Sequence, residues 1–104
     1  MDGIYKAGGN IKPPLVKNHV EAEFSDEARQ ESNRVPNFRA TSFLNLIVDI
    51  KGKPQDICVE QPAGFGLDIQ AVKAAKKYRF QPATKDGTPV AVLIKVKVNF
   101  IRVN

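Results

Sequence analysis

The stretch VAVLIKVKVNFIRV, from Val90 to Val103, is the longest regular pattern in the chain. Its even-numbered residues up to Phe100 are all apolar, whereas the odd-numbered ones mix aliphatic side chains with lysine and asparagine. Successive side chains of a strand point to opposite faces of a sheet, so this alternation is typical of a half-buried β-strand. A strand of this length predicts that a sheet forms the centre of the fold.

A helix is predicted upstream of this strand, from Asp68 to about Lys77. We expect Asp68 to be its N-cap, with Leu67 and Val72 forming a hydrophobic staple. Its apolar side is rich in alanine, which allows close approach to a sheet. The helix is expected to stop before Pro82.

The basic cluster at the end of this helix has a structural explanation. Lys76, Lys77 and Arg79 fall in the last turn, where cations offset the negative end of the helix dipole by about 0.3–1 kcal/mol each. Phe80 is expected to leave the helix for the core. The cluster therefore requires no nucleic acid.

Three further elements are predicted before this helix. A short helix runs from Ser25, its N-cap, to about Ser32. Residues 41–50 and 55–60 alternate as strands around the turn residues 51–54, which predicts a β-hairpin. Residues 1–19, with Gly-Gly-Asn and Lys-Pro-Pro motifs, are expected to be an extended lead-in or linker.

The order helix, strand, strand, helix, strand predicts an α+β fold. We expect a two-layer sandwich in which both helices cover one face of an antiparallel three-stranded sheet. The predicted strand order is second, first, third, so the last strand is an edge. At 104 residues the chain has the length of one domain, and we place that domain at residues 20–104.

Composition narrows the function only slightly. The net charge of +5 and pI near 9.5 fit nucleic acid, an anionic membrane surface or an acidic partner. The basic residues are spread over several segments, aromatics are few, and only Phe43 falls clearly on the exposed sheet face. A stacking platform for nucleic acid needs more aromatics there, so nucleic-acid binding is kept as a remote alternative and is not expected.

No constellation for enzyme chemistry is apparent. His19 is the only histidine, Cys58 is the only cysteine, and no spacing suits a metal site. We expect no catalytic residues, no cofactor and no metal. The chain also has no apolar run of the roughly 18–20 residues that a membrane span needs.

Taken together, five segments resemble the C-terminal domain of the TonB energy-transducer family. They are Glu23–Arg29 before the first helix, Leu44–Pro54 in the hairpin, Gly66–Val72 at the start of the second helix, Tyr78–Ala83 after it, and Gly87–Val90 before the last strand. The match spans about residues 20–100, in the family's order. Tyr78 stands where the family usually has tryptophan, and Ala22 replaces a proline or polar residue.

This resemblance implies a protein-interaction domain that works in the periplasm and is tethered to the inner membrane in the full-length protein. Its partners would be an outer-membrane TonB-dependent transporter, or another extended peptide, and inner-membrane motor proteins reached through parts outside this chain. The transporter's box peptide would pair with the edge of the last strand. The edge residues expected to pair are Val90, Ala91, Val92, Leu93, Ile94, Lys95, Val96, Lys97 and Val98. The possible receptor contacts are Glu21, Ala22, Glu23 and Phe24.

Two alternatives stay open. The opening residues 3–10 are similar to lead-ins of such domains in multidomain membrane proteins, including sensor-type metallopeptidases, which would give the domain a structural or sensory role. Phe43, Ile47, Leu93 and Ile101 make the outer sheet face more apolar than a monomer needs. A homodimer, a strand swap or cover by residues 4–16 would each explain this face.

Overall fold

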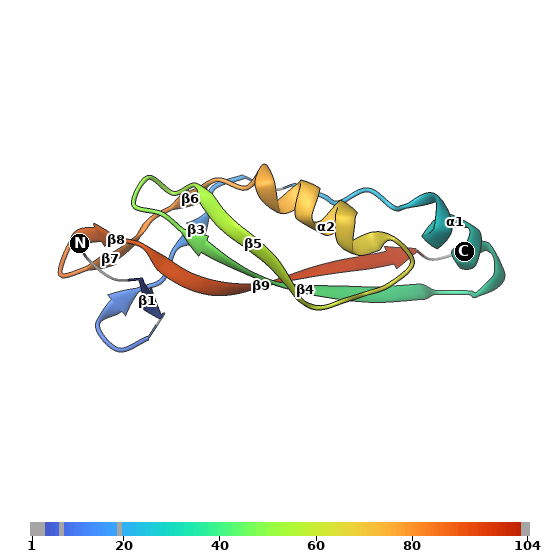
Figure 1. The fold of residues 1–104 in the computed structure, drawn as a ribbon, viewed down its shortest axis with the longest axis horizontal. Coiled ribbons are helices and arrows are strands. Elements are labelled where there is room, and N and C mark those ends of the chain that lie inside the picture. The colour runs from blue at the N-terminus through green and yellow to red at the C-terminus, as the bar shows by residue number, and fades with distance from the viewer. Residues whose placement is uncertain (1–3, 7, 19, 103–104) are drawn as a thin grey trace.

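The computed structural model describes residues 4–6, 8–18 and 20–102 of the chain. They form an elongated molecule of 51 × 22 × 20 Å, whose long axis follows two paired strands (Figure 1). The helices are α1 (Asp26–Arg34) and α2 (Leu67–Lys76). The strands are β1 (Tyr5–Lys6), β2 (Ile11–Lys12), β3 (Leu15–Val16), β4 (Phe38–Val48), β5 (Pro54–Gln61), β6 (Phe80–Gln81), β7 (Ala83–Lys85), β8 (Thr88–Val90) and β9 (Val92–Arg102).

The central sheet has the strand order β1-β9-β4-β5. The α+β class is confirmed, and the hairpin β4–β5 and the antiparallel pair β4–β9 follow the expected order. The expectation of three strands is wrong, because β1 adds a fourth strand parallel to β9. The backbone N–H of Tyr5 donates to the Ala91 carbonyl at 3.0 Å, and the half-buried Tyr5 side chain packs against the core.

The predicted last strand is divided at Ala91. Val90 belongs to β8 and pairs with Ala83, whereas Val92 begins β9 and pairs with Val48. Both valines are buried, so the apolar alternation passes through the break unchanged. Side-chain alternation reports which face is buried and carries no information on which strand is the neighbour. The predicted end of this strand, Val103, lies outside the described residues.

The core lies between one face of the central sheet and the helices. The alanine side of α2, where Ala71, Ala74 and Ala75 are 4% exposed or less, packs over β5 and β4, and the buried residues of β9 belong to the same core. Helix α1 follows at the end of the sheet, where Ala28 is buried and Phe24 packs edge-on against Phe100 at 5.9 Å. Figure 1 shows both helices on the same side of the long strands.

The two helices begin differently. Ser25 caps α1 as predicted, because its hydroxyl accepts the Ala28 N–H at 3.1 Å. The N-cap of α2 is Gly66 with φ 70°, so the prediction of Asp68 as cap is wrong. Asp68 lies inside the first turn of α2, and its carboxylate instead holds the loop before the helix.

The expected lead-in contains three short strands that pair with the rest of the chain. Besides β1, β2 pairs with β7 and β3 pairs with β6, both antiparallel. Asn18 adds a two-way link, because its amide nitrogen donates to the Lys77 carbonyl at 2.9 Å and its oxygen accepts the Arg79 N–H at 2.8 Å. Residues 15–18 are thereby joined to the end of α2 and the strand that follows it.

The end of α2 agrees only in part with the structural explanation of the basic cluster. Lys76 lies in the last turn and Lys77 is the C-cap, but Arg79 lies beyond the helix, so its placement in the last turn is wrong. The helix ends at Lys76, and the Arg79 guanidinium donates to the Lys76 and Tyr78 carbonyls at 3.2 and 2.7 Å. Phe80 is 3% exposed, as expected for a core residue. The Lys76 carbonyl is among those that a helix end leaves without helical partners.

Candidate functional site

The side of β9 that faces away from β4 is a partly open sheet edge. Backbone groups of a strand point alternately to its two neighbours, and Ala91 already directs its carbonyl to β1. The odd-numbered residues of β9 therefore turn their N–H and C=O groups toward this side. Strand β1 pairs only with Val92 and Leu93, and no other strand of the described residues pairs here. We call the remaining part, from Ile94 to Arg102, the open edge.

The open edge is regular along its whole length. The register between β4 and β9 runs from Phe38–Arg102 to Val48–Val92 without a shift. By alternation, the backbone groups of Lys95, Lys97, Asn99 and Ile101 project from it. A long, unbroken row of donors and acceptors is a good template for an added strand.

The opposite edge of the sheet, along β5, is a poorer template. Its pairing with β4 contains two register shifts, between Phe43 and Leu44 and between Asn45 and Ile47. Asp56 has φ 50°, and Pro54 lacks an N–H. Bulges and proline are common devices that block edge-to-edge pairing. Of the two edges, β9 is the one suited to receive an extended chain.

A groove of about 470 Å³ runs beside the second half of the open edge. We call it the contact groove. It is lined by Val20, Glu21, Ala22, Phe24, Tyr78, Lys97, Val98, Asn99 and Ile101. Burial raises the pKa of the Tyr78 phenol above its ordinary value of 10.0. The groove thus presents apolar side chains such as Phe24 and Ile101 together with polar ones that include Glu21 and Lys97.

The contact groove brings together two sets of residues that the sequence analysis named separately. Glu21, Ala22 and Phe24 lie beside Lys97 and Val98, although the two sets are far apart in the chain. Glu23 lies in a smaller hollow of about 160 Å³ against α2. This proximity was not predicted, because nothing in either segment specifies the packing of the other.

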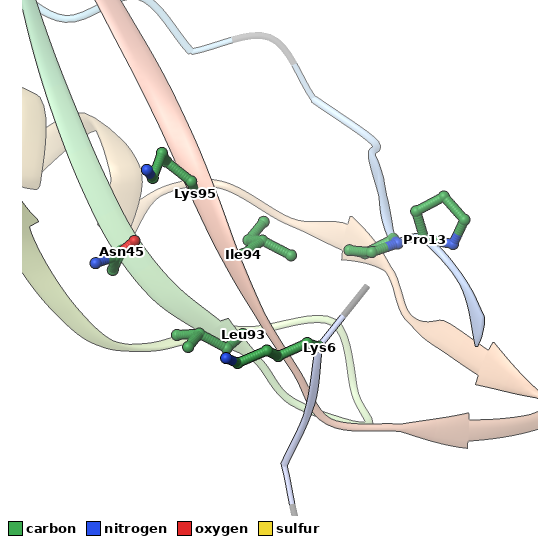
Figure 2. Close-up of a pocket in the computed structure, with 7 residues that line it drawn as sticks. Lys6, Pro13, Asn45, Leu93, Ile94 and Lys95 are labelled. Carbon is green, nitrogen blue, oxygen red and sulfur yellow. The ribbon is translucent and has the colours of Figure 1, made fainter. Parts of the chain in front are cut away.

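A second hollow, of about 530 Å³, lies where β1 ends on β9. We call it the terminal hollow. Its lining residues are Lys6, Pro13, Pro14, Asn45, Leu93, Ile94 and Lys95. Figure 2 shows Leu93, Ile94 and Lys95 along β9, with Lys6 at the end of β1 and Pro13 on the lead-in. Lys6 is the register partner of Leu93.

Side chains on the outer face of the sheet link its strands. The Lys95 ammonium lies 2.7 Å from a Glu60 carboxylate oxygen, and the Asn45 amide donates to the other oxygen at 2.6 Å. These two hydrogen bonds, that from Lys95 first, hold the pKa of the Glu60 carboxyl below its usual value. The Lys95 side chain is thus drawn across the face of β4, while its backbone groups remain at the open edge.

The predicted edge residues fall into three environments. Val90 lies in β8 and Ala91 in the break, whereas Val92 and Leu93 are opposite β1. Residues 94–98 lie on the open edge. The expected edge reached Phe100, although the residues expected to pair ended at Val98; in the structure β9 continues the same edge to Arg102. Their role in peptide binding stays a prediction.

Within the described ranges, no group of three or more histidine, cysteine, aspartate or glutamate side chains is placed to hold a metal ion. Cys58 is exposed on β5, and His19 lies outside the described residues. No helix of the described part has the length and apolar character that a membrane crossing requires.

These features define an α+β domain whose sheet has one regular open edge beside a groove. Among protein-family models, the one described as Gram-negative bacterial TonB protein C-terminal matches residues 21–101. The chain belongs to this family of periplasmic protein-interaction domains, whose members interact with outer-membrane transporters. None of the curated proteins matches the chain.

Proposed function

We propose that this chain is the partner-binding domain of a TonB-like energy transducer. In this proposal it works in the periplasm, and parts outside the chain tether it to the inner membrane and its motor proteins. Its partner is a short extended box peptide of an outer-membrane transporter. The peptide adds to the sheet as a new strand along the open edge of β9.

The observation that carries this proposal is the open edge itself. It is long, it has an unshifted register, and the contact groove lies alongside it. Backbone pairing would hold the peptide, and the groove would receive those side chains that point toward Phe24 and Tyr78. Family membership supports the same class of partner.

An order-of-magnitude estimate of the binding free energy indicates that contacts in the groove are needed for affinity. Roughly six backbone hydrogen bonds, at a net value of about 1 kcal/mol each, stabilise the pairing. Association costs at least about 4 kcal/mol. Pairing alone would therefore be weak, and apolar side-chain contacts in the groove must contribute most of the remaining affinity.

The test is a proline at Lys97. The Lys97 N–H points to the open edge and not to β4, so Lys97→Pro removes a donor from the docking surface while the β4 ladder keeps its bonds. We expect a folded variant that loses at least about tenfold in affinity, since a lost hydrogen bond and a ring that obstructs the new strand each cost about 1 kcal/mol or more. Binding of a box-like peptide is followed by amide chemical shifts in NMR titrations.

Two controls make this test specific. Lys97→Gln removes the same charge and keeps the N–H, so it should bind the peptide within about twofold of the unmodified chain, as expected for one exposed charge. Val96→Pro removes a donor that faces β4 and should unfold the sheet. If folded Lys97→Pro binds the peptide as tightly as Lys97→Gln, strand addition on β9 is wrong.

A further inference from the structure

The end of β1 is firmly held against β9. The Tyr5 N–H donates to the Ala91 carbonyl at 3.0 Å, and the Lys85 ammonium lies 5.0 Å from the centre of the half-buried Tyr5 ring. After β1 the chain turns, with the Ile11 N–H donating to the Gly8 carbonyl at 3.1 Å, and Ile11 is 8% exposed in the core. These contacts hold β1, a strand of only two residues, both at Tyr5 and through residues 8–11, which follow it in the chain.

This anchoring limits how far an added strand can extend. In a parallel ladder, Leu93 turns its N–H toward β1 as Ala91 does its carbonyl. The edge positions at Val92 and Leu93 therefore lie opposite β1, and the next residue of β9 that turns its backbone groups to this side is Lys95. A peptide on the open edge must end beside Lys6, in the terminal hollow.

The terminal hollow has a specific chemical character. Pro13, Pro14, Leu93 and Ile94 give it apolar walls, and two ammonium groups belong to its lining residues. Lys95 is already paired with Glu60 at 2.7 Å. No ion pair joins Lys6 to another residue of the described ranges, so its charge is available to a ligand.

We infer that β1 is a register stop for the bound peptide, and that Lys6 selects an acidic residue at the end of the peptide that reaches the terminal hollow. This inference rests on the proposed strand addition. A carboxylate there would accept a hydrogen bond from the Lys6 ammonium. Lys6 is exposed, so such a pair would have the strength of an exposed ion pair.

The test uses two blocked peptides in which valine and threonine alternate. One has aspartate at both ends and the other has asparagine at both ends, so that either strand direction places the test residue in the hollow. We expect the aspartate peptide to bind the full chain about two- to fivefold more tightly at low salt, the range of one exposed ion pair. The preference should disappear in Lys6→Gln.

The matched control is Lys12→Gln, which removes the same charge from an exposed lysine in β2, outside the terminal hollow. It should keep the preference for aspartate. The amide signals of Lys95 and Lys97 should shift on binding, while hydrogen exchange at Tyr5 and Leu93 stays slow, because β1 remains in place.

The results distinguish the register stop at β1 from strand addition on the open edge. If both peptides bind equally and shift Lys97, the role of Lys6 is overturned and the proposed function stands. If binding accelerates exchange at Tyr5, β1 is displaced and the register stop is overturned. If neither peptide binds, the proposed function fails and this inference fails with it.

Discussion

Asp68 was expected to cap α2, but its carboxylate instead accepts hydrogen bonds from groups around the start of the helix. Its carboxylate accepts the Ser42 hydroxyl at 2.6 Å and the N–H groups of Ala63 and Gly64 at 2.8 and 3.0 Å. Ser42 is fully buried on β4. One side chain thus joins the central sheet, the loop after β5 and the start of α2.

The pKa of Asp68 reflects this network. Burial acts to raise it, but the hydrogen bonds from Ser42, Ala63 and Gly64 outweigh burial and lower the pKa below the ordinary 3.8. A carboxyl whose pKa is lower in the folded than in the unfolded state stabilises the fold above its unfolded pKa. That contribution is lost as the pH falls through the folded pKa.

Asp68→Asn is expected to destabilise the fold by about 1–3 kcal/mol at pH 7, because the new amide group places a donor against an N–H donor of the loop. The gap between the two proteins should narrow as the pH falls below the ordinary pKa of 3.8, because the unfolded chain then takes up a proton that folded Asp68 binds less readily. Urea unfolding of both proteins across this pH range measures the difference between their free energies of unfolding. Asp86→Asn, the same change at an exposed turn, is the control, and an equal loss there would contradict the prediction.

At the scale of elements, a backbone hydrogen bond holds the hairpin turn between β4 and β5 against β6. Gly52 has φ 83°, its carbonyl accepts the Phe80 N–H at 2.9 Å, and a Cβ added to it would lie 2.0 Å from the Phe80 carbonyl oxygen. Asp49 closes the same turn by accepting the N–H groups of Lys51 and Lys53, each at 2.9 Å. The hairpin therefore contacts the chain that leaves α2.

Gly52→Ala should destabilise the protein by about 2–4 kcal/mol, since both the positive φ and the backbone collision oppose a side chain. The control is Gly87→Ala, at φ 82° with nothing within 4 Å of the added Cβ, which should cost only about 1 kcal/mol. Thermal unfolding compares the two variants. Equal losses would mean that the contact between the turn and Phe80 contributes nothing to stability.

At the scale of the whole molecule, the two sheet edges differ in their accessibility to a partner. The edge of β9 is regular and that of β5 is bulged, with β4 between them. Neighbouring strands lie about 4.8 Å apart, so the two edges are about 10 Å from each other. Cys58, exposed on β5, reports on the second edge only.

We expect iodoacetamide to alkylate Cys58 at the same rate with and without a bound box-like peptide, because the peptide lies on the far side of β4. Mass spectrometry of quenched samples gives the rate. The rate measured on the unfolded chain gives the upper limit for alkylation of an unprotected thiol. A slower reaction in the complex would place the peptide on β5 and would contradict docking on β9.

Much of the fold could be predicted because it depends on local signals. The alternation after Val92, the Ser25 cap and the alanine side of α2 each depend on neighbouring residues, and each was confirmed. The candidate site was predicted less well. Residues 94–98 do lie on the open edge, but the contribution of the lead-in to the sheet was missed.

The sequence by itself determined which side chains are buried, since burial follows the period of the apolar residues. The tertiary structure alone decided the strand count and the length of edge that stays open. Tyr5 and Lys6 meet Val92 and Leu93 through backbone groups, and every residue except proline carries the same donor and acceptor there. Such a pairing leaves no trace in side-chain pattern, so only the folded chain reveals it.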